Sequence, residues 1–76
     1  MSPRRVTLMI DGLALGGGGA LIVERALARL PGVLRVTVNP ATEMAYVEYD
    51  PAEAQAPQLL AAVEGVGFEA CVHAAR

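Results

Sequence analysis

The chain opens on a stretch in which every second residue is apolar. Within residues 4–10, the side chains of Val6, Leu8 and Ile10 alternate with a second set that faces the other way. A period of two is that of a β-strand with one buried face. The same period recurs in residues 68–72. The pattern therefore predicts a strand near each end of the chain.

Two more alternating stretches lie in the middle of the chain. Residues 33–38 and residues 43–49 each place an apolar side chain at every second position. Between them, residues 39–42 read Asn-Pro-Ala-Thr, which is the composition of a turn. We expect these two strands to form a hairpin.

Two further stretches have the period of an α-helix instead. In residues 20–30, Val23, Leu27 and Leu30 recur at intervals of four and three, so they share one face. Residues 57–66 begin with a proline, which suits the first turn of a helix, and carry a stripe of leucine and valine.

The order of elements is therefore strand, helix, strand, strand, helix, strand. Right-handed crossovers in such a chain place both helices on one face of the sheet. We predict an α+β, ferredoxin-like βαββαβ fold with a four-stranded antiparallel sheet, formed by residues 1–76 as a single domain. We expect residues 73–76 to fray.

A glycine-rich segment separates the first strand from the first helix. Residues 11–19 read Asp-Gly-Leu-Ala-Leu-Gly-Gly-Gly-Gly. Free N–H groups at a helix N-terminus can hold an anion, which is one interpretation of this segment. Ala20 and Leu21 follow where a phosphate loop carries Lys and Ser or Thr, which favours the other interpretation, a loop without a ligand.

Composition narrows the classes of function. The net charge is −2, with six basic and eight acidic residues, which argues against binding of nucleic acid, where a basic face is expected. A single cysteine excludes an internal disulfide and fits a reducing compartment, so we expect a cytoplasmic location. No apolar run is long enough for membrane contact by this segment. No carboxylate pair or Ser-His-Asp arrangement indicates an enzyme.

Several short stretches carry a specific likeness to a known family. They are Val-Glu-Arg-Ala-Leu at 23–27, Leu-Pro-Gly-Val at 30–33, Val-Asn at 38–39, Tyr-Asp-Pro at 49–51 and Gly-Phe-Glu-Ala at 67–70. With these in order, the chain resembles the heavy-metal-associated (HMA) domain family. That family includes metallochaperones and the N-terminal modules of metal-transporting P-type ATPases, so the resemblance implies the same ferredoxin-like fold.

The metal-binding Cys-x-x-Cys motif of that family has no counterpart here. When the family motif is aligned to this chain by counting back from Glu24, its two cysteines fall on Gly16 and Gly19. When it is aligned by counting forward from Gly12, the first cysteine falls on Leu15. None of these residues has a thiolate or thioether, the ligands that soft metal ions such as Cu(I) select.

The resemblance implies a degenerate HMA domain of a metal transport or trafficking system, with copper as the expected metal. A regulatory or docking role would remain, toward a protein partner in metal trafficking or toward the rest of a transporter chain. The alternative is a metal-independent protein-interaction module on the same scaffold.

Another pair of metal-ligating side chains lies near the C-terminus. Cys71 and His73 are two residues apart on a predicted strand, hence on one face, and are candidate ligands for weak binding of Cu(I) or Zn(II). Met1, Met9 or Met44 could supply a third ligand. The alternative is an outward cysteine and a histidine on a fraying tail.

Two further expectations concern where these residues lie on the predicted sheet. If the last strand lies antiparallel to the first, Phe68 lies near the glycine loop, and Cys71 and His73 lie toward the opposite pole of the sheet. The uncovered sheet face is a candidate docking surface, although an ordinary solvated face is the alternative. Its predicted residues are Thr7, Arg35, Thr37, Tyr46 and Glu48.

Overall fold

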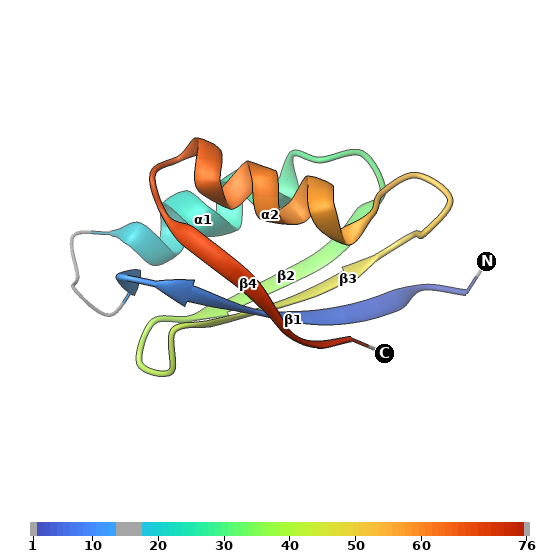
Figure 1. The fold of residues 1–76 in the computed structure, drawn as a ribbon. Coiled ribbons are helices and arrows are strands. Elements are labelled where there is room, and N and C mark those ends of the chain that lie inside the picture. Colours follow the sequence, from blue (N-terminus) through green and yellow to red (C-terminus); the bar gives the residue numbers. More distant parts are fainter. Residues whose placement is uncertain (1, 14–17, 76) are drawn as a thin grey trace.

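The structure is a two-layer α/β sandwich in which both helices cover one face of a single sheet (Figure 1). This computed structural model describes residues 2–13 and 18–75. The strand order is β2-β3-β1-β4, and every neighbouring pair is antiparallel. The predicted ferredoxin-like βαββαβ fold is confirmed. The elements are β1 (Arg4–Asp11), α1 (Gly19–Ala28), β2 (Val33–Asn39), β3 (Met44–Tyr49), α2 (Ala56–Gly65) and β4 (Glu69–Ala75).

The core lies between the sheet and the helices and is apolar throughout the described residues. β1, β3 and both helices bury the face that the sequence pattern marks as apolar, which removes these side chains from water, whereas β2 and β4 contribute only partly buried side chains. The largest fully buried side chains are those of Leu8, Ile10, Leu13, Val23, Leu27, Val47, Leu59 and Val63. The opposite face of the sheet has no helix over it (Figure 1).

The helix boundaries differ slightly from the prediction. α1 ends at Ala28, two residues before Leu30. Leu30 donates its N–H to the carbonyl of Leu27 in a tighter turn, at 3.1 Å, and Gly32 then takes a φ of +87°. A proline followed by a glycine in this conformation cannot continue a helix, so the chain turns into β2.

The predicted fraying of the C-terminus is wrong for residues 73–75. β4 stays paired with β1 as far as Ala75, which lies opposite Val6. The alternation in residues 68–72 predicts that Val72, like Phe68 and Ala70, lies on the buried face of this strand, but its side chain is 42% exposed. β4 is an edge strand, so it has a neighbouring strand on one side and solvent on the other.

Candidate functional site

The glycine segment between β1 and α1 is the place where the family resemblance predicts a metal site. Gly16 and Leu15, two of the positions predicted to replace the cysteines, lie outside the described residues. Gly12, Leu13 and Gly19 are described, as is Gly18. These residues show how the two ends of the segment are held.

The first end is fixed to the core and to the β2–β3 turn. Leu13 is 1% exposed and packs within the core. The N–H of Gly12 donates to the carboxylate Oε2 of Glu43 at 3.0 Å, and the N–H of Ile10 donates to the Glu43 carbonyl at 2.8 Å. The chain therefore leaves β1 in a defined direction.

The second end is the start of α1. Gly18 is the N-cap residue with a φ of +79°, and its carbonyl accepts the N–H groups of Leu21 and Ile22, each at 3.2 Å. Gly19 is buried, and a Cβ added there would lie 2.9 Å from Cζ of Phe68. The predicted position of Phe68 beside this segment is confirmed.

The family's copper site does not fit this segment. After Asp11, its described residues are glycines and a leucine, and residues 14–17 read Ala-Leu-Gly-Gly, so no side chain in residues 12–19 offers sulfur, nitrogen or oxygen. Cu(I) selects thiolate and thioether ligands, and a backbone carbonyl or amide is a poor substitute for either. A metal site at this position cannot be transferred from the family to this chain.

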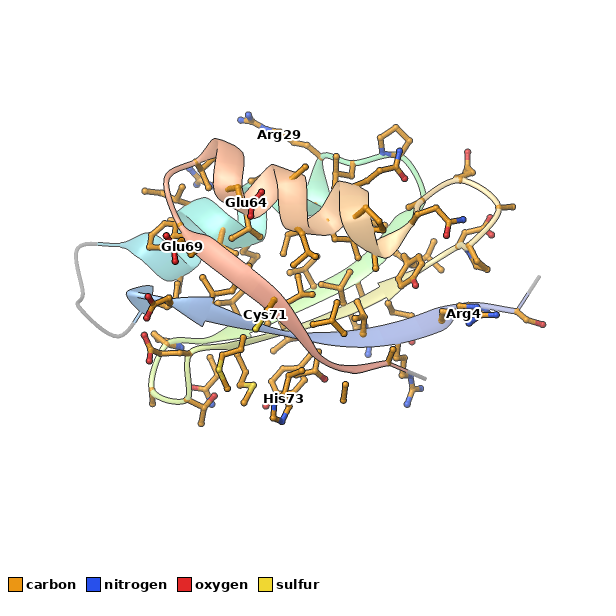
Figure 2. All side chains as sticks on the ribbon, in the orientation of Figure 1. Arg4, Arg29, Glu64, Glu69, Cys71 and His73 are labelled. Carbon is orange, nitrogen blue, oxygen red and sulfur yellow. The ribbon has the colours of Figure 1, made fainter. Side chains whose placement is uncertain are left out.

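Three carboxylates surround the same end of the sheet. Asp11 lies directly opposite Glu69 in the β1–β4 register, and Glu43 contacts the backbone of Gly12. Figure 2 shows Glu69 at the end of the molecule where α1 begins. Negative charge here opposes an anion at the N-terminus of α1, so the anion-binding interpretation loses support.

Among the described residues, no group of three or more His, Cys, Asp or Glu side chains could hold a metal ion.

Cys71 and His73 lie closer to the middle of the sheet than predicted. Cys71 lies opposite Met9 in the β1–β4 register, and Met9 lies opposite Met44 of β3. The prediction that the pair occupies the pole opposite the loop is wrong, because β4 begins beside Asp11 and Cys71 is only two residues further along. Sequence reasoning gave Met9 and Met44 as possible partners but not their register.

The uncovered sheet face carries a shallow hollow of about 510 Å³. All five predicted docking-face residues line it. Arg5 and Arg35 lie opposite Glu48 on either side, and Arg5 donates from Nε to the carboxylate of Glu48 at 3.3 Å. The hollow therefore has an ion pair in its lining together with apolar side chains, and Tyr46, which is 46% exposed, also lines it.

Neither helix of the described structure is long and apolar enough to cross a membrane.

The chain belongs to the heavy-metal-associated domain family, which matches residues 18–69. It is 34% identical over 65 residues to a copper-exporting P-type ATPase of Bacillus subtilis (strain 168), a match that covers 86% of this chain and 8% of the ATPase. The chain thus spans less than a tenth of the length of that relative.

Two solved structures have the same fold. One is the solution structure of the N-terminal domain of a potential copper-translocating P-type ATPase from Bacillus subtilis in its Cu(I)-loaded state. It has a TM-score of 0.90 and 28% identity, over 99% of this chain and 92% of that domain. The other is oxidized MerP from Ralstonia metallidurans CH34, with a TM-score of 0.91 and 26% identity, over 96% of this chain and all of MerP. This chain is thus related to copper-transporter modules and to chaperone-like domains.

Proposed function

We propose that this chain is a non-catalytic docking domain of a copper transport or trafficking system, acting in the cytoplasm. It would contact a protein partner through the start of α1 without taking copper at the glycine segment. The observation that carries the proposal is a contrast within one site. The family's loop keeps its packed ends at Leu13 and Gly19, yet its sequence has no thiolate or thioether for a copper ion.

Exposed apolar side chains beside the loop support docking. Leu21 and Ile22, in the first turn of α1, are 49% and 48% exposed. Two adjacent aliphatic side chains on a helix that is otherwise anchored in the core offer apolar surface for a partner to bury. The carboxylates of Asp11 and Glu69 at the same end of the sheet favour a partner with basic residues around an apolar centre.

The partner class follows from the family. A metallochaperone, CopZ, shares this fold at a TM-score of 0.82 and 27% identity. We propose that a domain of this kind, or another segment of a transporter, docks against the start of α1. Docking would regulate transport or position the partner, while copper stays on the partner.

The test is a titration of the ¹⁵N-labelled chain with unlabelled CopZ, once without metal and once loaded with Cu(I). We expect amide shifts confined to residues 18–22 and the start of β4 that differ between metal-free and Cu(I)-loaded CopZ, and copper that remains on CopZ. Absence of shifts with both forms would contradict docking. Equal shifts with both forms would support the alternative, a metal-independent interaction module.

A matched pair of variants locates the surface. Leu21→Glu places a charge at the proposed interface, whereas Leu34→Glu places one on the edge strand β2, where the native side chain is 47% exposed. Because both leucines are similarly exposed, neither change is expected to unfold the chain. Leu21→Glu should abolish the shifts and Leu34→Glu should leave them unchanged.

A further inference from the structure

Three sulfur-bearing side chains form a row across the uncovered face of the sheet. Met9 of β1 lies directly between Cys71 of β4 and Met44 of β3 in the strand register. Leu8 and Ile10, its neighbours in β1, are completely buried, so Met9 points away from the helices. Directly opposed residues on adjacent strands have Cβ atoms about 4.5–5.5 Å apart. The thiol of Cys71 and the thioether of Met9 are thus near neighbours on one face.

A β-bulge adds an imidazole to this row. The register steps from Val72 to Ala74 across one residue of β1, which leaves His73 as the extra residue of β4. Bulges redirect side chains, and Figure 2 shows the His73 side chain on the side of the sheet away from the helices. His73 therefore shares the open face with Cys71, two residues earlier.

The side chains of Cys71, His73 and Met9 are all accessible to solvent. Cys71 is a free, exposed cysteine, His73 is exposed, and Met9 is 41% exposed. Because the Met9 side chain is exposed, it buries little apolar surface, and packing against the sheet does not account for a methionine at this position. A thiol, a thioether and an imidazole on one face are, however, a set of soft metal ligands.

From this juxtaposition we infer that Cys71, Met9 and His73 form a binding site for one Cu(I) ion on the open face of the sheet. Thiolate and thioether sulfur select Cu(I), whereas Zn(II) sites in proteins are built from Cys, His and carboxylate ligands. The thiol proton leaves as the ion binds. The three ligands come from two adjacent strands whose register fixes their spacing.

Met44 provides an internal comparison. It also lies beside Met9, but on the far side from β4. Two strand spacings, about 9.6 Å, separate its backbone from that of Cys71. An ion held between Cys71 and Met9 therefore lies closer to the backbone of either of these residues than to the backbone of Met44. The site is distinct from the glycine segment and does not depend on the proposed docking function.

The test is an anaerobic competition for Cu(I) between the reduced chain and bicinchoninate, a chromogenic Cu(I) ligand. We expect the chain to withdraw a single Cu(I), with amide shifts at Met9 and Cys71. Cys71→Ser, Met9→Leu and His73→Gln should each weaken binding about tenfold or more, because each removes a ligand. Met44→Leu removes a neighbouring thioether and should leave the affinity unchanged.

Several results would overturn the site. They are no copper withdrawn from bicinchoninate, full affinity in Cys71→Ser, an equal loss in Met44→Leu and Met9→Leu, or shifts at Gly18 and Gly19 instead. Circular dichroism of each variant separates a lost ligand from a lost fold. Docking of CopZ is measured independently, so failure of one proposal leaves the other intact.

Discussion

Gly19, the first residue of α1, lies against the ring of Phe68, the residue before β4. A Cβ at residue 19 would lie 2.9 Å from Cζ and 3.4 Å from Cε1 of that ring. The ring occupies the space that any side chain at this position would need. The last glycine of the run therefore has a structural role, because it lets the start of α1 approach the start of β4.

This contact predicts coupling between the two residues. Gly19→Ala should lower the free energy of unfolding by about 1 kcal/mol, because overpacking costs about 1–3 kcal/mol and alanine regains about 0.5–1 kcal/mol in a helix. In a Phe68→Ala background the ring is gone, so Gly19→Ala should become neutral or stabilising. Urea denaturation of both single variants and the double variant measures the coupling. Additive effects would show that the ring does not oppose a side chain at residue 19.

A second glycine is required for a different reason. Gly32, between α1 and β2, has a φ of +87°, and a Cβ there would lie 2.7 Å from Cβ of Glu53. Gly32→Ala should lower the free energy of unfolding by about 2–4 kcal/mol, since the left-handed backbone and the overpacking both penalise a side chain.

Gly65, the last residue of α2, is the matched control. Its backbone φ is not positive, and nothing lies within 4 Å of an added Cβ. Gly65→Ala should therefore raise the free energy of unfolding by up to about 1 kcal/mol. Thermal or urea denaturation compares the two variants, and similar losses in both would contradict this account of Gly32.

The sequence determined the elements of this fold because their periods are strong and local. The alternation in β1 and β3, the helical stripes and the turn between β2 and β3 are all confirmed. The approach of Phe68 to the glycine segment followed from strand direction. The failures at Val72 and residues 73–75 concern edge position and pairing length, which depend on distant segments.

The open-face row of sulfur side chains shows the same limit. Parity placed Met9 and Cys71 on outward faces of their strands, but only the register shows that they lie opposite one another. The bulge at His73 lies beyond this pair, between Val72 and Ala74, and no local pattern in the sequence predicts it. A site that depends on the register between strands distant in the sequence could therefore not be predicted from the sequence.

The hydrogen bond between Glu43 and Gly12 predicts a local effect on dynamics. Glu43 has a φ of +58°, an uncommon backbone conformation for a residue with a side chain, and its carboxylate accepts the Gly12 N–H. Glu43→Ala removes this acceptor and should accelerate hydrogen exchange of the Gly12 amide about tenfold, because a hydrogen bond contributes about 0.5–1.5 kcal/mol. Glu43→Gln keeps an amide oxygen and should retain most of the protection. Equal exchange rates in the two variants would show that the side-chain oxygen does not protect Gly12.

The opposed carboxylates of Asp11 and Glu69 predict a trade between stability and docking. Like charges directly opposite one another across two strands destabilise a sheet. Glu69→Gln should raise the free energy of unfolding by about 0.2–1 kcal/mol at low salt, with a smaller gain at high salt. In an Asp11→Asn background the repulsion is already absent, so the same change should give no gain. If the acidic end of the sheet recognises a basic partner, Glu69→Gln should also weaken the CopZ-induced shifts at Leu21 and Ile22. A variant that is more stable yet docks less well would show that the repulsion is retained for binding, and unchanged docking would remove the charge argument from the proposed interface.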